Sequence, residues 1–152
     1  MKKALVLIAL WVLPAYGADY TIDMNGNGVW DFLDQVIYEA IPEGGVLAVE
    51  NLARNLQEFT KAGNNQSLAY QSMSRAQESS QCILSIYGGD VGGKILTAIA
   101  GTMRMHPEIA EKFVRSEQLI VGQPIPYNED PSTWRELYCP ESLKKPHVPS
   151  FR

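Results

Sequence analysis

One stretch near the amino terminus, DMNGNGVWDFLD at 23–34, has the residue types and the spacing of a metal-binding loop. Calcium prefers about six to eight hard oxygen ligands, which short Asp and Asn side chains on a tightly wound loop can supply. Oxygen donors recur at alternate positions and at the last one: Asp23, Asn25, Asn27, the Val29 main-chain carbonyl, Asp31 and Asp34. Gly28 stands where the chain must turn sharply. The spacing predicts a calcium site, against the alternative of an Asn-Gly turn with helix-capping aspartates.

This pattern resembles the calcium loop of EF-hand and dockerin proteins. The sequence departs from the EF-hand loop at two places, with Asp34 where Glu is usual and Trp30 where a small β-branched residue is usual. The resemblance covers 23–34 and implies bound Ca²⁺ held by the same ligand positions. Because the chain has no second loop to couple ion binding to a helix movement, we expect a structural ion rather than a sensor.

The segments that must position this loop have helical periodicity. The first two predicted helices are 31–40 and 46–62, ended by Gly44–Gly45 and by Gly63. The second has two faces: Val49, Leu52, Ala53, Leu56 and Phe59 on the apolar one, and Glu50, Arg54, Asn55 and Glu58 on the polar one. Further helices are predicted at 66–87, at 94–105 after a break over Gly88–Gly93, from Pro107 onward, and at 132–138.

This organisation predicts an all-α fold. No run of alternating strands and no internal repeat is evident, and the length suits one domain. We expect a single small domain of five or six helices over residues 18–143. A flexible tail is predicted at 144–152.

The first residues, MKKALVLIALWVLPAYGA, have the pattern of a secretory signal peptide. Lys2 and Lys3 precede a short apolar core, and small residues then precede a cut before Ala18. This predicts a signal peptide at 1–17 and a mature protein in a Gram-negative periplasm, against the alternative of an uncleaved membrane anchor. The net charge is −4 with no run of Lys or Arg among aromatic residues, which gives little electrostatic support to binding nucleic acid or anionic lipid.

The two cysteines, Cys82 and Cys139, are expected to form a disulfide, because an oxidising compartment favours pairing over free thiols. A thiol nucleophile or a zinc site is the alternative, and only His106 and His147 could assist either of them.

Groups for catalysis are few. The sequence has no GxSxG and no HExxH. Gly88 to Lys94 imitates a phosphate-binding loop, but Ile95 stands where Ser or Thr should hold magnesium. Glu39 or Glu78 could act as an acid on a sugar chain, although spacing indicates no paired carboxylate. We therefore predict that the protein is not an enzyme.

The segment GQPIPYNEDPSTWRELY concentrates Tyr127, Trp134 and Tyr138 next to Cys139. It is either a protruding loop with aromatic anchors for a partner protein or a tail wrapped over the helices and pinned by the disulfide. The segment Gly88–Gly93 is a second candidate for contact with a partner protein.

A small exported helical protein with one disulfide is expected here. In size and type, such a protein resembles the periplasmic immunity proteins of interbacterial toxin (type VI secretion) systems. These proteins block the active site of a cell-wall-degrading effector. The resemblance implies a non-catalytic inhibitor with such an effector as its protein partner. The alternatives are a peptidoglycan-acting hydrolase and an accessory envelope protein, each with structural calcium.

Overall fold

The computed structural model describes residues 19–42 and 44–144. The predicted signal peptide, 1–17, lies outside these residues, as do residues 145–152 of the predicted tail. The described chain is helical without strands, which confirms the expected all-α single domain. Its elements are α1 (Asp31–Ala40), α2 (Val46–Thr60), α3 (Gln66–Arg104), α4 (Pro107–Leu119), the 3₁₀ turn η1 (Pro131–Thr133), α5 (Trp134–Tyr138) and α6 (Glu141–Lys144).

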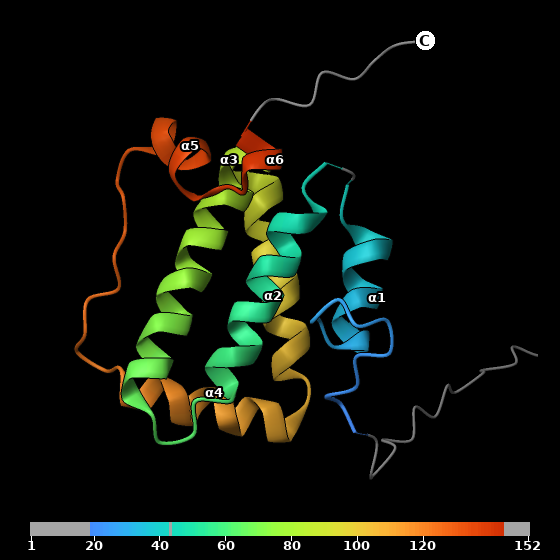
Figure 1. Ribbon diagram of the computed structural model, residues 1–152, viewed down its shortest axis with the longest axis vertical. Helices are drawn as coiled ribbons and strands as arrows, with labels where there is room; N and C mark the ends of the chain where they lie inside the picture. The colour runs from blue at the N-terminus through green and yellow to red at the C-terminus, as the bar shows by residue number, and fades with distance from the viewer. Residues whose placement is uncertain (1–18, 43, 145–152) are drawn as a thin grey trace, which may run out of the picture.

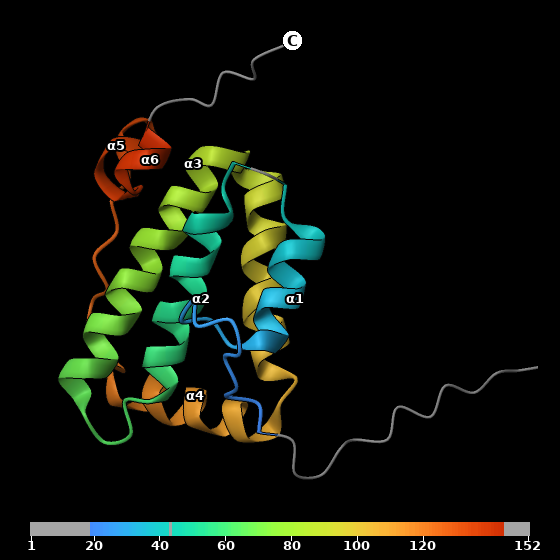
Figure 2. The same ribbon diagram turned by 45° about the vertical axis from the view of Figure 1, so that its right-hand side comes forward.

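The helices form a bundle, and shorter helices cover each of its two ends (Figure 1). The central part is α2 packed between the two halves of α3, and α1 flanks α2 and the second half. Figure 2 shows α4 crossing one end of the bundle, while α5 and α6 lie at the other end. The chain returns from α4 to α5 along the outside of the first half of α3.

The length of α3 is interrupted at Gly88, whose φ of 76° and ψ of 171° are not helical. The chain reverses there, so that residues 66–87 and 89–104 run antiparallel (Figures 1 and 2). The expected break over Gly88–Gly93 was therefore too long, because one glycine in this conformation reverses the chain and the helix resumes directly after it. Gly92 instead permits close packing: an added Cβ would lie 3.2 Å from the Leu84 Cα.

Among the described residues, α3 alone is long and apolar enough to cross a membrane, by length and composition only. The reversal at Gly88 divides that length into two antiparallel helices.

The core lies where α2, α3 and α4 meet. All five residues of the apolar face predicted for α2 are buried: Val49, Leu52, Ala53, Leu56 and Phe59. The Phe59 and Phe113 rings meet edge to face with centroids 5.0 Å apart, which fixes α4 across the end of α2. The Ser116 hydroxyl donates to the Phe59 carbonyl at 2.6 Å, so the end of α2 is hydrogen-bonded inside the core.

The helix ends follow the sequence signals. The helix predicted over 46–62 ends at Thr60, two residues early, and Gly63 follows in the turn with a φ of 59°, in the left-handed region. The Asn65 side chain accepts from the Leu68 N–H at 3.0 Å and caps α3. Pro107 occupies the first turn of α4, as predicted.

Candidate functional site

The amino-terminal loop, residues 23–34, is a tight turn closed by its own polar side chains. Gly26 and Gly28 have φ values of 72° and 83°, in the left-handed region that favours glycine. The two oxygens of Asp23 accept from the N–H groups of these glycines, each at 2.8 Å. The side-chain oxygens of Asn25 and Asn27 accept from main-chain N–H groups two residues further on, at 2.9 and 2.7 Å. The loop is thus wound as the residue types predict.

Asp34 is the centre of the loop. Its buried carboxylate accepts from the Asn25 amide at 2.7 Å and from the Asn27 amide at 2.9 and 3.1 Å. Asp31 instead accepts from the Met24 N–H at 2.9 Å, and Val29 has its side chain in the core. The structure therefore brings Asn25, Asn27 and Asp34 together, with Asp23 and Asp31 turned to main-chain N–H groups.

The donor set fits a hard cation in composition, with three carboxylates and two side-chain amides in one loop. In this structure the two amide N–H₂ groups face the Asp34 carboxylate, where a cation would require oxygens. Hydrogen bonds thus satisfy the carboxylate. No group of three or more His, Cys, Asp or Glu side chains that could hold a metal ion occurs among residues 19–42 and 44–144.

Two side chains of α2 fasten the loop to this helix. Gln57, only 2% exposed, donates to the Gly28 carbonyl at 3.0 Å and accepts from the Trp30 N–H at 2.9 Å. Arg54 donates to the Asn27 carbonyl at 2.9 Å and pairs with Glu50, also at 2.9 Å.

These contacts correct the expected polar face of α2. Glu50 was placed on the solvent face but is 9% exposed, because the loop and α1 fold over it. The Tyr38 hydroxyl donates to Glu50 at 2.6 Å, and this bond raises the pKa of Tyr38 above its ordinary value. The sequence does not predict this network; its one signal there is the spacing of four residues between Glu50 and Arg54.

The carboxy-terminal strap, defined as residues 122–140, runs along α3 and ends at the disulfide. Cys82 and Cys139 are bonded with their Cα atoms 5.0 Å apart, which confirms the predicted pair. The buried side chain of Gln81 donates to the Asn128 carbonyl at 2.9 Å, and the Trp134 indole donates to the same oxygen at 2.8 Å. The strap is therefore fixed by side chains as well as by the covalent bond.

The three aromatic residues predicted to contact a partner have different surroundings. Tyr127 is 55% exposed, whereas Trp134 is 7% exposed and supports the Tyr127 ring edge-on at a centroid distance of 5.8 Å. Tyr138 is partly buried against the core. Leu137, which no sequence pattern marks as a contact residue, is 58% exposed. The segment is a tail wrapped over the bundle that still presents Tyr127 and Leu137.

Asp130 stabilises the turn between these residues. The hydroxyl of Ser132 donates to the Asp130 carboxylate at 2.6 Å and its main-chain N–H donates at 3.0 Å. These bonds, the hydroxyl first, lower the pKa of Asp130 below its ordinary value.

The predicted acids of a hydrolase have ordinary surface positions. Glu39 is exposed and accepts from Gln35 at 3.1 Å, and Glu78 is exposed on α3. His106 lies between the rings of Tyr20 and Phe32, at centroid distances of 4.1 and 4.4 Å. Gly88–Gly93, the second candidate contact, is a reversal followed by helix rather than a loop.

No protein-family model matches the chain, and comparison with curated proteins and with solved structures gave no significant match. The functional reasoning therefore rests on the residues described above.

Proposed function

We propose that the protein is a non-catalytic binding protein of the periplasm that inhibits a cell-wall-degrading effector by occupying its active site. The observation that carries this proposal is the carboxy-terminal strap. It presents Tyr127 and Leu137 to solvent while Gln81, Trp134 and the disulfide hold its backbone.

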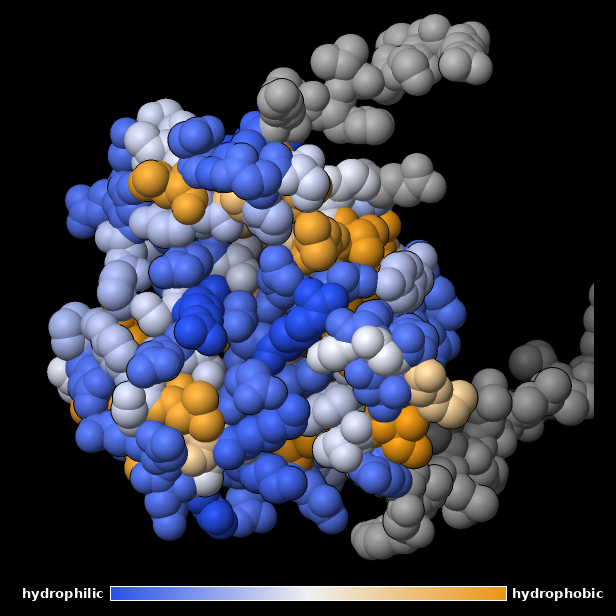
Figure 3. Space-filling view, viewed as in Figure 1, coloured by the Kyte–Doolittle hydropathy of each residue, from blue (hydrophilic) through white to orange (hydrophobic). Residues whose placement is uncertain are grey.

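Rigidity supports an inhibitory role, because a contact that is already ordered loses less conformational entropy on binding. Tyrosine is among the residues that most often dominate a protein interface. Figure 3 shows that the face in view is mainly hydrophilic, with small separate hydrophobic patches, one of them at the end that carries α5 and α6. A partner of modest contact area, such as the mouth of an enzyme cleft, suits this distribution.

A direct test is binding and inhibition. The mature protein is titrated against candidate peptidoglycan hydrolases, and both the dissociation constant and the hydrolysis of purified peptidoglycan are measured. Tyr127→Ala should weaken binding by about 30-fold, the effect of losing about 2 kcal/mol at an interface centre. Val114→Ala, an equally exposed apolar residue on α4, is the matched control and should bind as the wild type.

Two results would contradict the proposal. One is equal binding by the Tyr127 and Val114 variants, which would remove the strap from the contact. The other is lytic activity of the purified protein on a peptidoglycan zymogram that Glu78→Gln or Glu39→Gln abolishes. That result would replace the inhibitor with a hydrolase.

We also propose that the amino-terminal loop binds a structural Ca²⁺, supported by the spacing of its three carboxylates and two side-chain amides. Binding requires the Asn25 and Asn27 amides, which donate to Asp34 in this structure, to turn their oxygens toward the ion. An ion bound only by the folded protein adds stability, so EDTA should lower the melting temperature and excess calcium should restore it. Asp23→Ala should abolish that response, whereas Asp90→Ala, an exposed carboxylate on α3, should retain it.

Comparing EDTA with Asp23→Ala distinguishes stabilisation by a bound ion from stabilisation by the hydrogen bonds of the loop. If EDTA leaves the melting temperature unchanged while Asp23→Ala lowers it, hydrogen bonds, including those from Gly26 and Gly28 to Asp23, hold the turn without bound calcium.

A further inference from the structure

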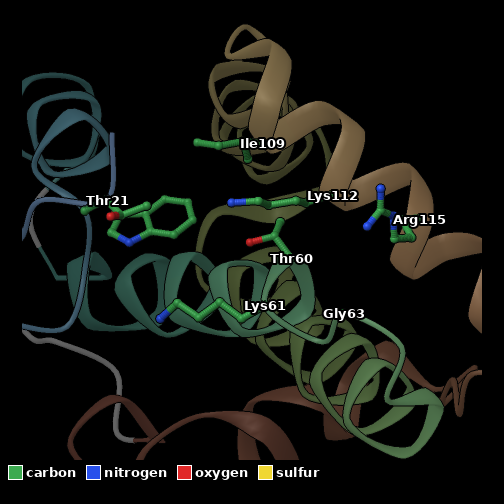
Figure 4. A pocket seen from close by; sticks show the side chains of 8 residues that line it. Thr21, Thr60, Lys61, Gly63, Ile109, Lys112 and Arg115 are labelled. Atoms are coloured by element: carbon green, nitrogen blue, oxygen red, sulfur yellow. The ribbon is translucent and has the colours of Figure 1, made fainter. Parts of the chain in front are cut away.

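A cleft of about 410 Å³ opens between the amino-terminal loop, the end of α2 and α4. Three cationic side chains line it: Lys61, Lys112 and Arg115. In a chain with a net charge of −4, this gathering of positive charge is unexpected. Figure 4 shows Lys112 extending across the cleft between Ile109 and Thr60, with Lys61 below and Arg115 further along α4.

The three cations differ in how far they are neutralised. Lys61 pairs with Glu58 at 2.9 Å, and Arg115 pairs with Glu111 at 3.0 Å. Lys112 has no carboxylate within 4.0 Å among the described residues; Asp19 acts on it only at longer range and is hydrogen-bonded to Thr21. The cleft therefore retains about one uncompensated positive charge, located on Lys112.

The other residues that line the cleft are two apolar side chains, two threonines and a glycine: Trp30, Ile109, Thr21, Thr60 and Gly63. Trp30 and Ile109 line the cleft and are nearly buried, so a ligand can only touch their outer edges. The Lys61 ammonium lies 5.9 Å from the centre of the Trp30 ring, close enough for a cation–π interaction. The Thr60 hydroxyl donates to the Gln57 carbonyl at 2.7 Å, which leaves its oxygen as an acceptor. A complementary ligand combines one negative charge with a flat apolar group.

We propose that this cleft binds a carboxylate attached to an aromatic or other apolar group, with Lys112 holding the carboxylate and Trp30 and Ile109 contacting the apolar part. A single uncompensated cation matches a monoanion better than a doubly charged phosphate. The carboxylate can belong to a free aryl acid or to an acidic residue beside an aromatic one in a peptide. The site does not depend on bound calcium or on inhibition of an effector.

The test is a titration of ¹⁵N-labelled protein followed by amide chemical shifts at low salt. Phenylacetate supplies a free acid, and N-acetyl-Phe-Glu-amide supplies the peptide source. Phenylacetamide is the uncharged control, and inorganic phosphate is the anion without an apolar group. We expect saturable shifts at 60–63 and 109–115 with phenylacetate or the peptide, and none with phenylacetamide or phosphate. The ligand that binds with the higher affinity, phenylacetate or the peptide, identifies the source of the carboxylate.

Lys112→Gln should weaken binding at least about tenfold, as expected for loss of a charge-assisted hydrogen bond. Lys94→Gln removes an exposed cation from the distant α3 surface and should leave binding unchanged. Equal binding of phenylacetamide, equal affinity of the Lys112 variant, or shifts confined to other surfaces would overturn the assignment. Because the wild-type shift map decides the location by itself, the test remains decisive even if a variant folds poorly.

Discussion

Reduction of the Cys82–Cys139 bond should lower the free energy of unfolding by about 4 kcal/mol. The two cysteines are separated by 57 residues, and the bond joins the first half of α3 to the residue after α5. In the chain-entropy model, opening a loop of this length returns about 14 cal/mol/K to the unfolded chain, or about 4 kcal/mol at 25 °C. This is a large share of the roughly 5–15 kcal/mol by which domains of this size are stable.

The assay is urea unfolding of the mature protein followed by far-ultraviolet circular dichroism, with and without a phosphine reductant. The slope of unfolding free energy against urea should also rise on reduction, because the unfolded chain without a crosslink exposes more surface. Ser85→Ala is the control for local packing, since this hydroxyl lies 3.6 Å from the Cys139 sulfur and the variant leaves the bond intact. It should cost no more than about 1.5 kcal/mol.

A loss below about 1 kcal/mol with an unchanged slope would refute this reasoning. It would mean that the crosslink does not restrict the unfolded ensemble. A second refuting result is a reduced protein whose Trp134 fluorescence changes to that of an exposed indole while its helical circular dichroism is retained. The strap would then unfold independently of the bundle.

Three further predictions concern the backbone reversal, the docked loop and the strap. Gly88→Ala should cost about 1–3 kcal/mol in urea unfolding, because its backbone conformation is essentially restricted to glycine; Gly89→Ala, with open space around the added methyl group, should be neutral or stabilising. Gln57→Ala should cost about 2 kcal/mol or more, because it leaves main-chain groups of the loop unpaired; a cost no greater than that of the exposed control Gln71→Ala would contradict this. Asp130 should titrate below the ordinary aspartate pKa by NMR, since Ser132 stabilises its charged form. Its contribution to stability is therefore complete above the unfolded-state pKa and lost as pH falls through the folded-state pKa, so the stability gap to Asp130→Asn should close in acid; a gap independent of pH would exclude it.

Local patterns determined most of the secondary structure. The apolar spacing in 46–62 and the signal at Pro107 act within a few residues, and the structure places α2 within that range, ending at Thr60, and starts α4 at Pro107. Glycine clustering predicted the break in α3 but not its extent, because flexibility at several glycines does not specify which one adopts the reversing conformation.

Longer-range contacts decided the surroundings of the candidate sites. The sequence by itself determined the helical class, the pairing of the only two cysteines, and the donor spacing of 23–34. The burial of Glu50, the support of Tyr127 by Trp134, and the convergence of cations from α2 and α4 arise only when distant segments pack together. Periodicity reports which face of a helix is apolar, but which segment covers a polar face, and what that contact leaves exposed, is fixed by the tertiary structure.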